Sequence, residues 1–135
     1  MNPNEKSLRD DIINEAKKRY KASDEHLWAG APNDFILRRS DNRKWFAVVM
    51  NIDGGKLGLD GERASILNVK AEPEMIALLA GTPGYFPGYH MNKSCWLTVL
   101  LDGTVDRRNI FSLLDTSFEL TAGGKRTGNR RGNAK

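Results

Sequence analysis

Four short runs of strand-forming residues, each followed by turn residues, constrain the fold of this chain more than any other feature. The runs cover residues 35–40, 44–52, 65–70 and 96–101 and are rich in β-branched and aromatic side chains. Asp41, Asn42 and Arg43 separate the first two runs. This spacing predicts a β-hairpin, because Asp and Asn tolerate the backbone angles that a tight reversal needs.

The third run predicts a strand with one buried face, because Leu67 and Val69 alternate with Asn68 and Lys70. The glycine-rich segment 53–62 before it is expected to be an exposed connection, and residues 84–90 are expected to hold a further short strand.

Three segments carry helical patterns. Apolar residues at four-residue spacing predict an amphipathic helix over roughly residues 5–21. A short helix is expected between Pro73 and Gly81, with acidic residues beside its first turn. The clearest helix follows Asp106, a good N-cap, and has apolar-face positions at Ile110, Leu113, Leu114, Ser117 and Phe118.

The resulting order α-β-β-β-α-β-β-α predicts a two-layer α+β domain with a largely antiparallel sheet. We expect one domain over residues 1–122 and a flexible basic tail over residues 123–135. Five of the 21 basic residues and none of the 17 acidic residues lie in the tail, so the rest of the chain is close to neutral. The five are Lys125, Arg126, Arg130, Arg131 and Lys135.

Several classes of protein are disfavoured by what the sequence contains. The single cysteine, Cys95, allows no disulfide framework, and the charged N-terminus and short apolar runs predict a soluble, cytoplasmic protein without a membrane span. No P-loop or metal-ligand spacing occurs, so we expect neither cofactor nor metal. His90 and Cys95 lie five residues apart in a segment entering a strand, which favours an inert thiol over a nucleophile.

Five stretches in this order and spacing resemble the MmcQ/YjbR-like family of small bacterial proteins: "LRRSDNRKWFAVV", "ILNVK", "PGYFPGYHMNK", "WLTVLLDG" and "LLDTSFEL". The resemblance covers about residues 5–121. It implies an α-β3-α-β2-α fold in two layers, which agrees with the order read from the residues. It also implies DNA binding through paired loop-and-strand projections.

The residues themselves offer two such projections. Basic and amide side chains on protruding loops can contact phosphates or base edges of double-stranded DNA, with low sequence specificity expected here. Tyr85, Phe86 and Tyr89 could add stacking surfaces, although packing beneath the loop is the more common role of such residues. The candidate contacts are Arg38, Arg39, Arg43 and Lys44 in the hairpin, His90, Asn92 and Lys93 before Trp96, and the tail residues Lys125, Arg126, Arg130 and Arg131.

Alternatives remain open at this point. The hairpin bases could instead be paired with Asp34 and Asp41 as a solvated face. The domain could be a protein-interaction module, similar to secretion chaperones, that uses a sheet face or helix groove. A third possibility is a small-ligand site or enzyme near His90. We expect a non-enzymatic protein that is a monomer rather than an obligate oligomer, with Trp28, Trp45 and Trp96 in the core or at its rim.

Overall fold

The computed structural model describes residues 3–60 and 62–123, which form three α-helices and five strands. The chain runs α1 (Pro3–Tyr20), β1 (Phe35–Arg38), β2 (Trp45–Asp53), the short 3-10 helix η1 (Gly54–Leu57), β3 (Arg63–Lys70), α2 (Pro73–Leu79), β4 (Tyr85–Pro87), β5 (Trp96–Leu100) and α3 (Arg107–Leu120). The predicted two-layer α+β fold and its element order are confirmed. Only η1 was missed, in the segment expected to be a loop.

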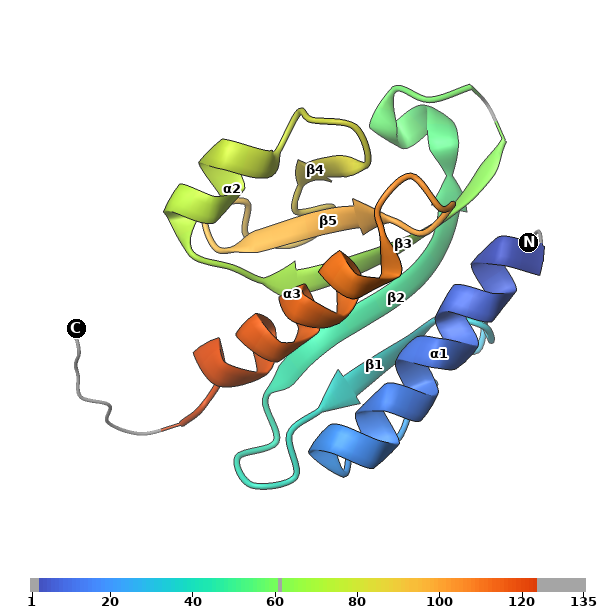
Figure 1. Cartoon of the computed structure of the whole chain (residues 1–135). Coiled ribbons are helices and arrows are strands. Elements are labelled where there is room, and N and C mark those ends of the chain that lie inside the picture. Colours follow the sequence, from blue (N-terminus) through green and yellow to red (C-terminus); the bar gives the residue numbers. More distant parts are fainter. Residues whose placement is uncertain (1–2, 61, 124–135) are drawn as a thin grey trace.

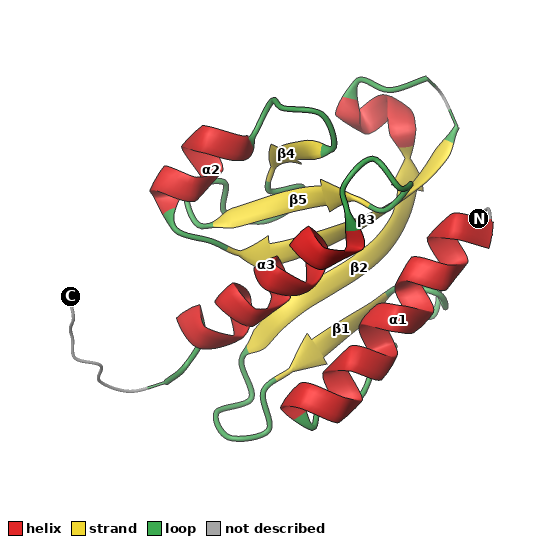
Figure 2. Ribbon diagram, viewed as in Figure 1, coloured by secondary structure: helices red, strands yellow, loops and turns green. Residues whose placement is uncertain are grey.

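The sheet has the order β1-β2-β3-β5-β4, and every neighbouring pair is antiparallel. β1 and β2 form the predicted hairpin, and the register shifts between Leu37 and Arg38 so that Phe46 becomes an extra residue on β2. Because of this bulge, Phe46 and Ala47 both reach the helix-side core. Figures 1 and 2 show α1 and α3 lying in front of the sheet.

All three helices contribute to a single core on one face of the sheet. Ile12 and Ala16 of α1, Ile76 of α2, and Ile110 and Leu114 of α3 pack there. The strands supply alternate residues to the same core, as the period of two requires. These strand residues include Phe35, Leu37, Ala47, Val49, Leu67, Val69, Leu97 and Val99.

The other face of the sheet is covered by loops. Ile52, Ala64, Ile66 and Leu100 form a second cluster, against which Leu57 of η1 and Tyr89 of a loop pack. The prediction that β3 has one exposed face is therefore wrong at Asn68, which is fully buried. Its carboxamide is satisfied by hydrogen bonds with Thr98 and with the backbone of Tyr89.

Residues 24–33 run along the free edge of β1. Glu25 and Ile36 exchange both backbone hydrogen bonds, at 3.0 and 3.1 Å. The His26 ring has Nδ1 2.8 Å from the Pro32 carbonyl oxygen and Nε2 2.6 Å from the Asp24 carboxylate. Both partners are acceptors, so this geometry favours the imidazolium form. The hydrogen bond with Asp24 raises the pKa of His26.

Ser117 joins α3 to β2 and β3. Its hydroxyl donates to the Phe46 carbonyl at 2.6 Å and accepts from the Lys70 backbone N–H at 2.8 Å, in a site without solvent exposure. The sequence pattern predicted Ser117 on the buried face of this helix, and its hydroxyl is fully used there. In the part of the chain that the structure describes, no helix is both long and apolar enough to cross a membrane.

We expect Ser117→Ala to lower the free energy of unfolding by about 1–3 kcal/mol, because two buried backbone groups lose their partner. Urea unfolding of both proteins measures this difference. Ser112→Ala, on the exposed side of the same helix, serves as the control and should change stability by less than about 0.5 kcal/mol. Equal effects of the two substitutions would contradict the assigned role of Ser117.

The His26 bridge should make stability depend on pH. Because folding raises the pKa of His26 above 6.5, its contribution is fully present below 6.5 and is lost as the pH rises through the folded value. We expect the difference in melting temperature between wild type and His26→Gln to shrink over that interval. The difference will be small because the side chain is 42% exposed. A difference that grows with pH would contradict the bridge.

Candidate nucleic-acid interface

The two predicted projections lie at the same end of the sheet. Arg38 pairs with Trp45, Lys70 with Trp96, and Pro87 with Leu97. The β1–β2 turn and the loop from Gly88 to Cys95 therefore both leave the sheet at this end, with β3 ending between them. Tyr20, the last residue of α1, packs on Phe46 and Phe118, so the C-terminal ends of α1 and α3 reach the same end. In Figure 1 the β1–β2 turn lies at the bottom of the molecule, and α1 and α3 both run down toward that side.

Arg39 is a structural residue of the hairpin turn. It is 7% exposed, its guanidinium lies 3.9 Å from the Phe118 ring centroid, and it donates to the Phe118 carbonyl oxygen. It also forms a two-point ion pair with Asp41 at 2.8 and 2.9 Å. The hydrogen bonds from Arg39 lower the pKa of the Asp41 carboxyl. Of the two carboxylates considered as partners of the hairpin bases, Asp41 is paired, and its partner is Arg39. Asp34 instead accepts a hydrogen bond from the Asn51 backbone N–H.

Arg38 and Asn42 connect this turn to its surroundings. Arg38 pairs with Glu25 at 3.1 Å and donates to the Arg43 carbonyl at 3.3 Å, which ties the turn to residues 24–33. The Asn42 carboxamide donates to the Thr121 carbonyl at 2.8 Å and accepts from the Lys44 backbone N–H at 2.9 Å. The turn is thus fixed against both the sheet edge and the end of α3.

Arg43 and Lys44 remain as the exposed cations of the turn. The side chains of both are without an ion pair to the described residues. Arg43 has φ of 68°, in the left-handed region. The sequence predicted four basic contact residues in the hairpin. In the structure Arg38 and Arg39 hold the turn in place, and Arg43 and Lys44 are left exposed to solvent.

The second loop is fixed to the loop-covered face of the sheet by polar groups. The Tyr89 backbone N–H donates to the Thr98 hydroxyl at 2.8 Å, and the Asn68 carboxamide donates to the Tyr89 carbonyl at 3.0 Å. Gly88 allows this approach, because a Cβ there would lie 2.9 Å from the Trp96 Cβ. His90 follows with φ of 59°, exposed, with its ring centroid 4.2 Å from that of Tyr89.

The other polar residues of this loop stabilise it internally. Asn92 accepts from the Ser94 backbone N–H and hydroxyl at 3.0 and 2.7 Å, and Lys93 donates to the Gly88 carbonyl at 2.7 Å. Cys95 is a half-buried free thiol. No hydrogen bond joins it to His90 among the described residues. Asn92 and Lys93 thus hold the loop in shape through hydrogen bonds, whereas the His90 side chain forms none with the described residues.

The aromatic residues divide between core and surface. Tyr85, Phe86 and Tyr89 are half-buried and pack against the two cores, as expected for such residues. Trp96 is buried, but Trp28 is 37% exposed, so the prediction of a core or rim position does not hold for Trp28. It lies edge-to-face on Trp45, with ring centroids 6.2 Å apart.

Three non-glycine residues among those described have positive φ: Lys21, Arg43 and His90. All three are basic types, and all lie at this end of the fold. Sequence analysis missed Lys21, although its place directly after the last turn of α1 is where helices commonly adopt the left-handed conformation. The left-handed region costs an L-residue about 1–2 kcal/mol, so glycine would be the cheaper choice at each position.

The tail residues Lys125, Arg126, Arg130 and Arg131 lie outside the described residues. The described chain ends at Gly123, where a Cβ would lie 2.9 Å from the Asn42 carboxamide nitrogen. The tail therefore begins beside the hairpin turn. Acidic residues are present at this end as well, since Glu72 and Glu74 follow β3 and are exposed. Exposed bases at the end of α1, Lys17, Lys18 and Lys21, add to those of the turn at this end.

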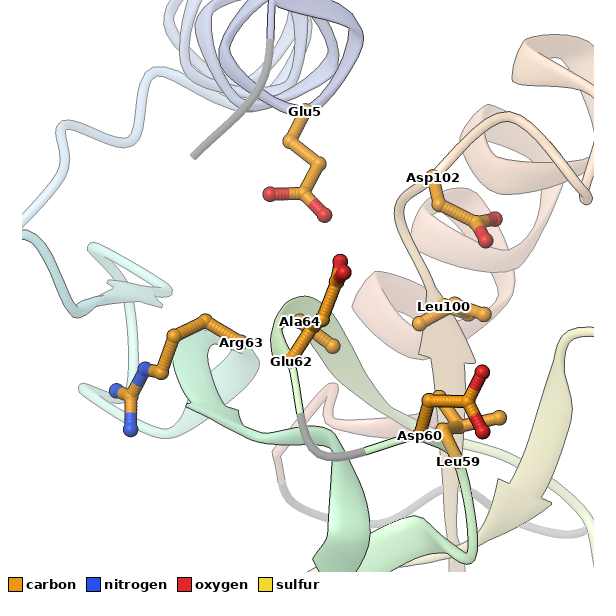
Figure 3. A pocket seen from close by; sticks show the side chains of 8 residues that line it. All are labelled: Glu5, Leu59, Asp60, Glu62, Arg63, Ala64, Leu100 and Asp102. Carbon is orange, nitrogen blue, oxygen red and sulfur yellow. The ribbon is translucent and has the colours of Figure 1, made fainter.

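The opposite end of the sheet carries an acidic pocket of about 350 Å³. Figure 3 shows the carboxylates of Glu5, Asp60, Glu62 and Asp102 around it, with the Arg63 side chain pointing away. Arg63 donates to Asn51 instead, at 2.9 and 2.6 Å. Among the described residues no group of three or more acidic, His or Cys side chains could hold a metal ion. Four carboxylates therefore gather around this pocket, at the end of the sheet away from Arg43 and His90.

Comparisons with known proteins place this fold among small bacterial proteins. The uncharacterised protein YyaQ of Bacillus subtilis strain 168 is 39% identical over 114 residues, which cover 84% of this chain and 97% of YyaQ. A crystal structure of a Pseudomonas syringae protein has a TM-score of 0.81 and 39% identity, over 84% of this chain and 98% of that one. A Deinococcus radiodurans protein with a DUF419 domain shares the fold, with a TM-score of 0.64 and 24% identity, over 83% and 76% of the two chains.

The model of the YjbR family matches residues 18–120, which contain all five strands, α2 and α3. The matched residues include the five stretches on which the resemblance was based, from the β1–β2 hairpin to α3. The resemblance inferred from the sequence is therefore confirmed, and the chain belongs to the YjbR family.

Proposed function

We propose that this protein is a non-enzymatic DNA-binding protein that contacts phosphates through Arg43, Lys44 and His90. The observation that carries the proposal is the placement of basic residues at strained, exposed positions. Arg43 and His90 hold left-handed backbone angles in two separately anchored loops at one end of the sheet. Strained backbone of this kind is concentrated at functional sites.

The supporting residues give the site its rigidity. Arg38, Arg39 and Asn42 fix the hairpin turn, while Thr98, Asn68 and Lys93 fix the His90 loop. Cations held by a rigid scaffold lose less conformational entropy when they bind than cations on free loops. In this proposal the braced residues shape the surface, and the exposed residues contact DNA.

The charge distribution supports a defined orientation on DNA. The acidic pocket at the far end of the sheet would be repelled by phosphates, whereas the tail begins beside the hairpin turn. Phosphate contacts of this kind position a protein but carry no base information, so binding should have low sequence specificity.

A protein-contact function is the second candidate, because α2 presents Met75 and Leu78 to solvent one turn apart, 40% and 71% exposed. Two such side chains form a small apolar patch of the kind that can mark an interaction site. They lie on a different element from the basic turns, so the two functions can be tested separately.

We expect the double substitution Arg43→Glu, Lys44→Glu to weaken binding to a labelled duplex by at least about tenfold at low salt. Two lost phosphate contacts should also reduce the slope of log affinity against log salt by about 1.8. Fluorescence anisotropy over a salt series measures both quantities.

The matched control is Lys56→Glu, Arg108→Glu, which changes the net charge equally at two exposed positions near the acidic end. This control should lower affinity far less. A second full-length variant, with the tail residues Lys125, Arg126, Arg130 and Arg131 replaced by Gln, separates the contribution of the tail. If only the tail variant loses affinity, the folded loops are not the DNA surface, and the protein-contact function becomes the better candidate.

A further inference from the structure

Trp28 is an exposed aromatic side chain in a segment that has little freedom to move. The residue is 37% exposed, and its indole lies edge-to-face against Trp45, the residue that follows Lys44 at the base of the hairpin turn. Leu27 beside it is 47% exposed. Trp28 therefore contacts the residue next to Lys44, one of the proposed DNA contacts.

Three separate interactions hold the segment that carries Trp28. Glu25 is hydrogen-bonded through its backbone to β1, and the His26 ring joins Asp24 to Pro32. The Trp28 carbonyl accepts from the Ala31 backbone N–H at 3.1 Å. A large apolar side chain on a mobile loop could fold back onto the protein, but here both flanks are fixed and the indole stays exposed.

Basic side chains and indole rings lie together at the end of the sheet next to Trp28, where Arg38 is paired with Glu25. Arg38 pairs with Glu25 of this segment and donates to the Arg43 carbonyl, so one guanidinium links the Trp28 segment to the hairpin turn. Arg38 is opposite Trp45 on the neighbouring strand, and Lys70 is opposite Trp96, with its ammonium 5.6 Å from the indole centroid. Cations and aromatic rings thus alternate in these pairs along the end of the sheet where the loops project.

We propose that Trp28 is a stacking platform for an unpaired base, so that the DNA surface prefers single-stranded over double-stranded DNA. The inference rests on the proposed function and adds the class of substrate. A base in a duplex has both of its faces covered by stacking, whereas an unpaired base can lie on an exposed indole. Cationic side chains that follow the backbone, beside aromatic rings that accept bases, are the common arrangement in proteins that bind single strands.

The test compares a labelled oligothymidine with a duplex of the same length, using wild type, Trp28→Leu and Trp28→Phe. We expect Trp28→Leu to reduce affinity for the oligothymidine by about 5- to 150-fold, because stacking on one base contributes about 1–3 kcal/mol. Duplex affinity should change less than about twofold. Trp28→Phe, which keeps an aromatic face, should retain most of the affinity for the single strand.

A control variant and a fluorescence measurement complete this test. Leu59→Ala removes a side chain of the same 37% exposure from the other end of the sheet and should leave both affinities unchanged. Quenching of tryptophan fluorescence in wild type by oligothymidine reports stacking without any substitution, in case Trp28→Leu does not fold. Unchanged single-strand affinity in folded Trp28→Leu, or absence of quenching, overturns the inference. The proposed function then still stands if Arg43→Glu, Lys44→Glu weakens duplex binding, and it fails separately if that variant binds normally.

Discussion

The need to cover a second apolar face of the sheet determines most of this structure. All three helices lie on one face, so the residues of the other face, such as Ile66 and Leu100, must be covered by loops. A loop that crosses a sheet needs partners for its backbone groups. The buried pair Asn68 and Thr98 supplies them to Tyr89. A polar pair in the middle of the sheet therefore fixes the loop that carries His90.

The basic residues gather on two loops that are each fixed by their own partners. The hairpin turn is held by Arg38, Arg39 and Asn42 to elements on both sides of it, and the second loop is held by the sheet itself. Each loop then presents one residue with positive φ, Arg43 or His90. The fold thus provides two rigid supports at one end, while carboxylates gather around the pocket at the other end.

The element order was predictable because hydrophobic periodicity and turn residues agree locally along the chain, as at Asp106 before α3. The role of each basic residue was not predictable, because the burial of a side chain depends on elements that are distant in the sequence. Arg39 is buried only because Phe118, 79 residues later, lies beneath its guanidinium. Asn68 looked like a solvent-facing strand residue because nothing in β3 itself shows that a loop crosses it. Trp28 was expected in the core or at its rim because tryptophan is a large apolar residue. The fixed segment around it keeps its ring exposed.

In this proposal Arg43 occupies its strained loop position for binding and not for folding. Arg43→Gly separates the two roles when urea unfolding and anisotropy on labelled DNA are measured on the same full-length protein. We expect the free energy of unfolding to change by less than about 1 kcal/mol or to rise, because glycine adopts φ of 68° without strain. We also expect DNA affinity to fall several-fold and the slope of log affinity against log salt to fall by about 0.9. A loss of stability above about 2 kcal/mol with unchanged DNA affinity would show that Arg43 serves folding and does not contact DNA.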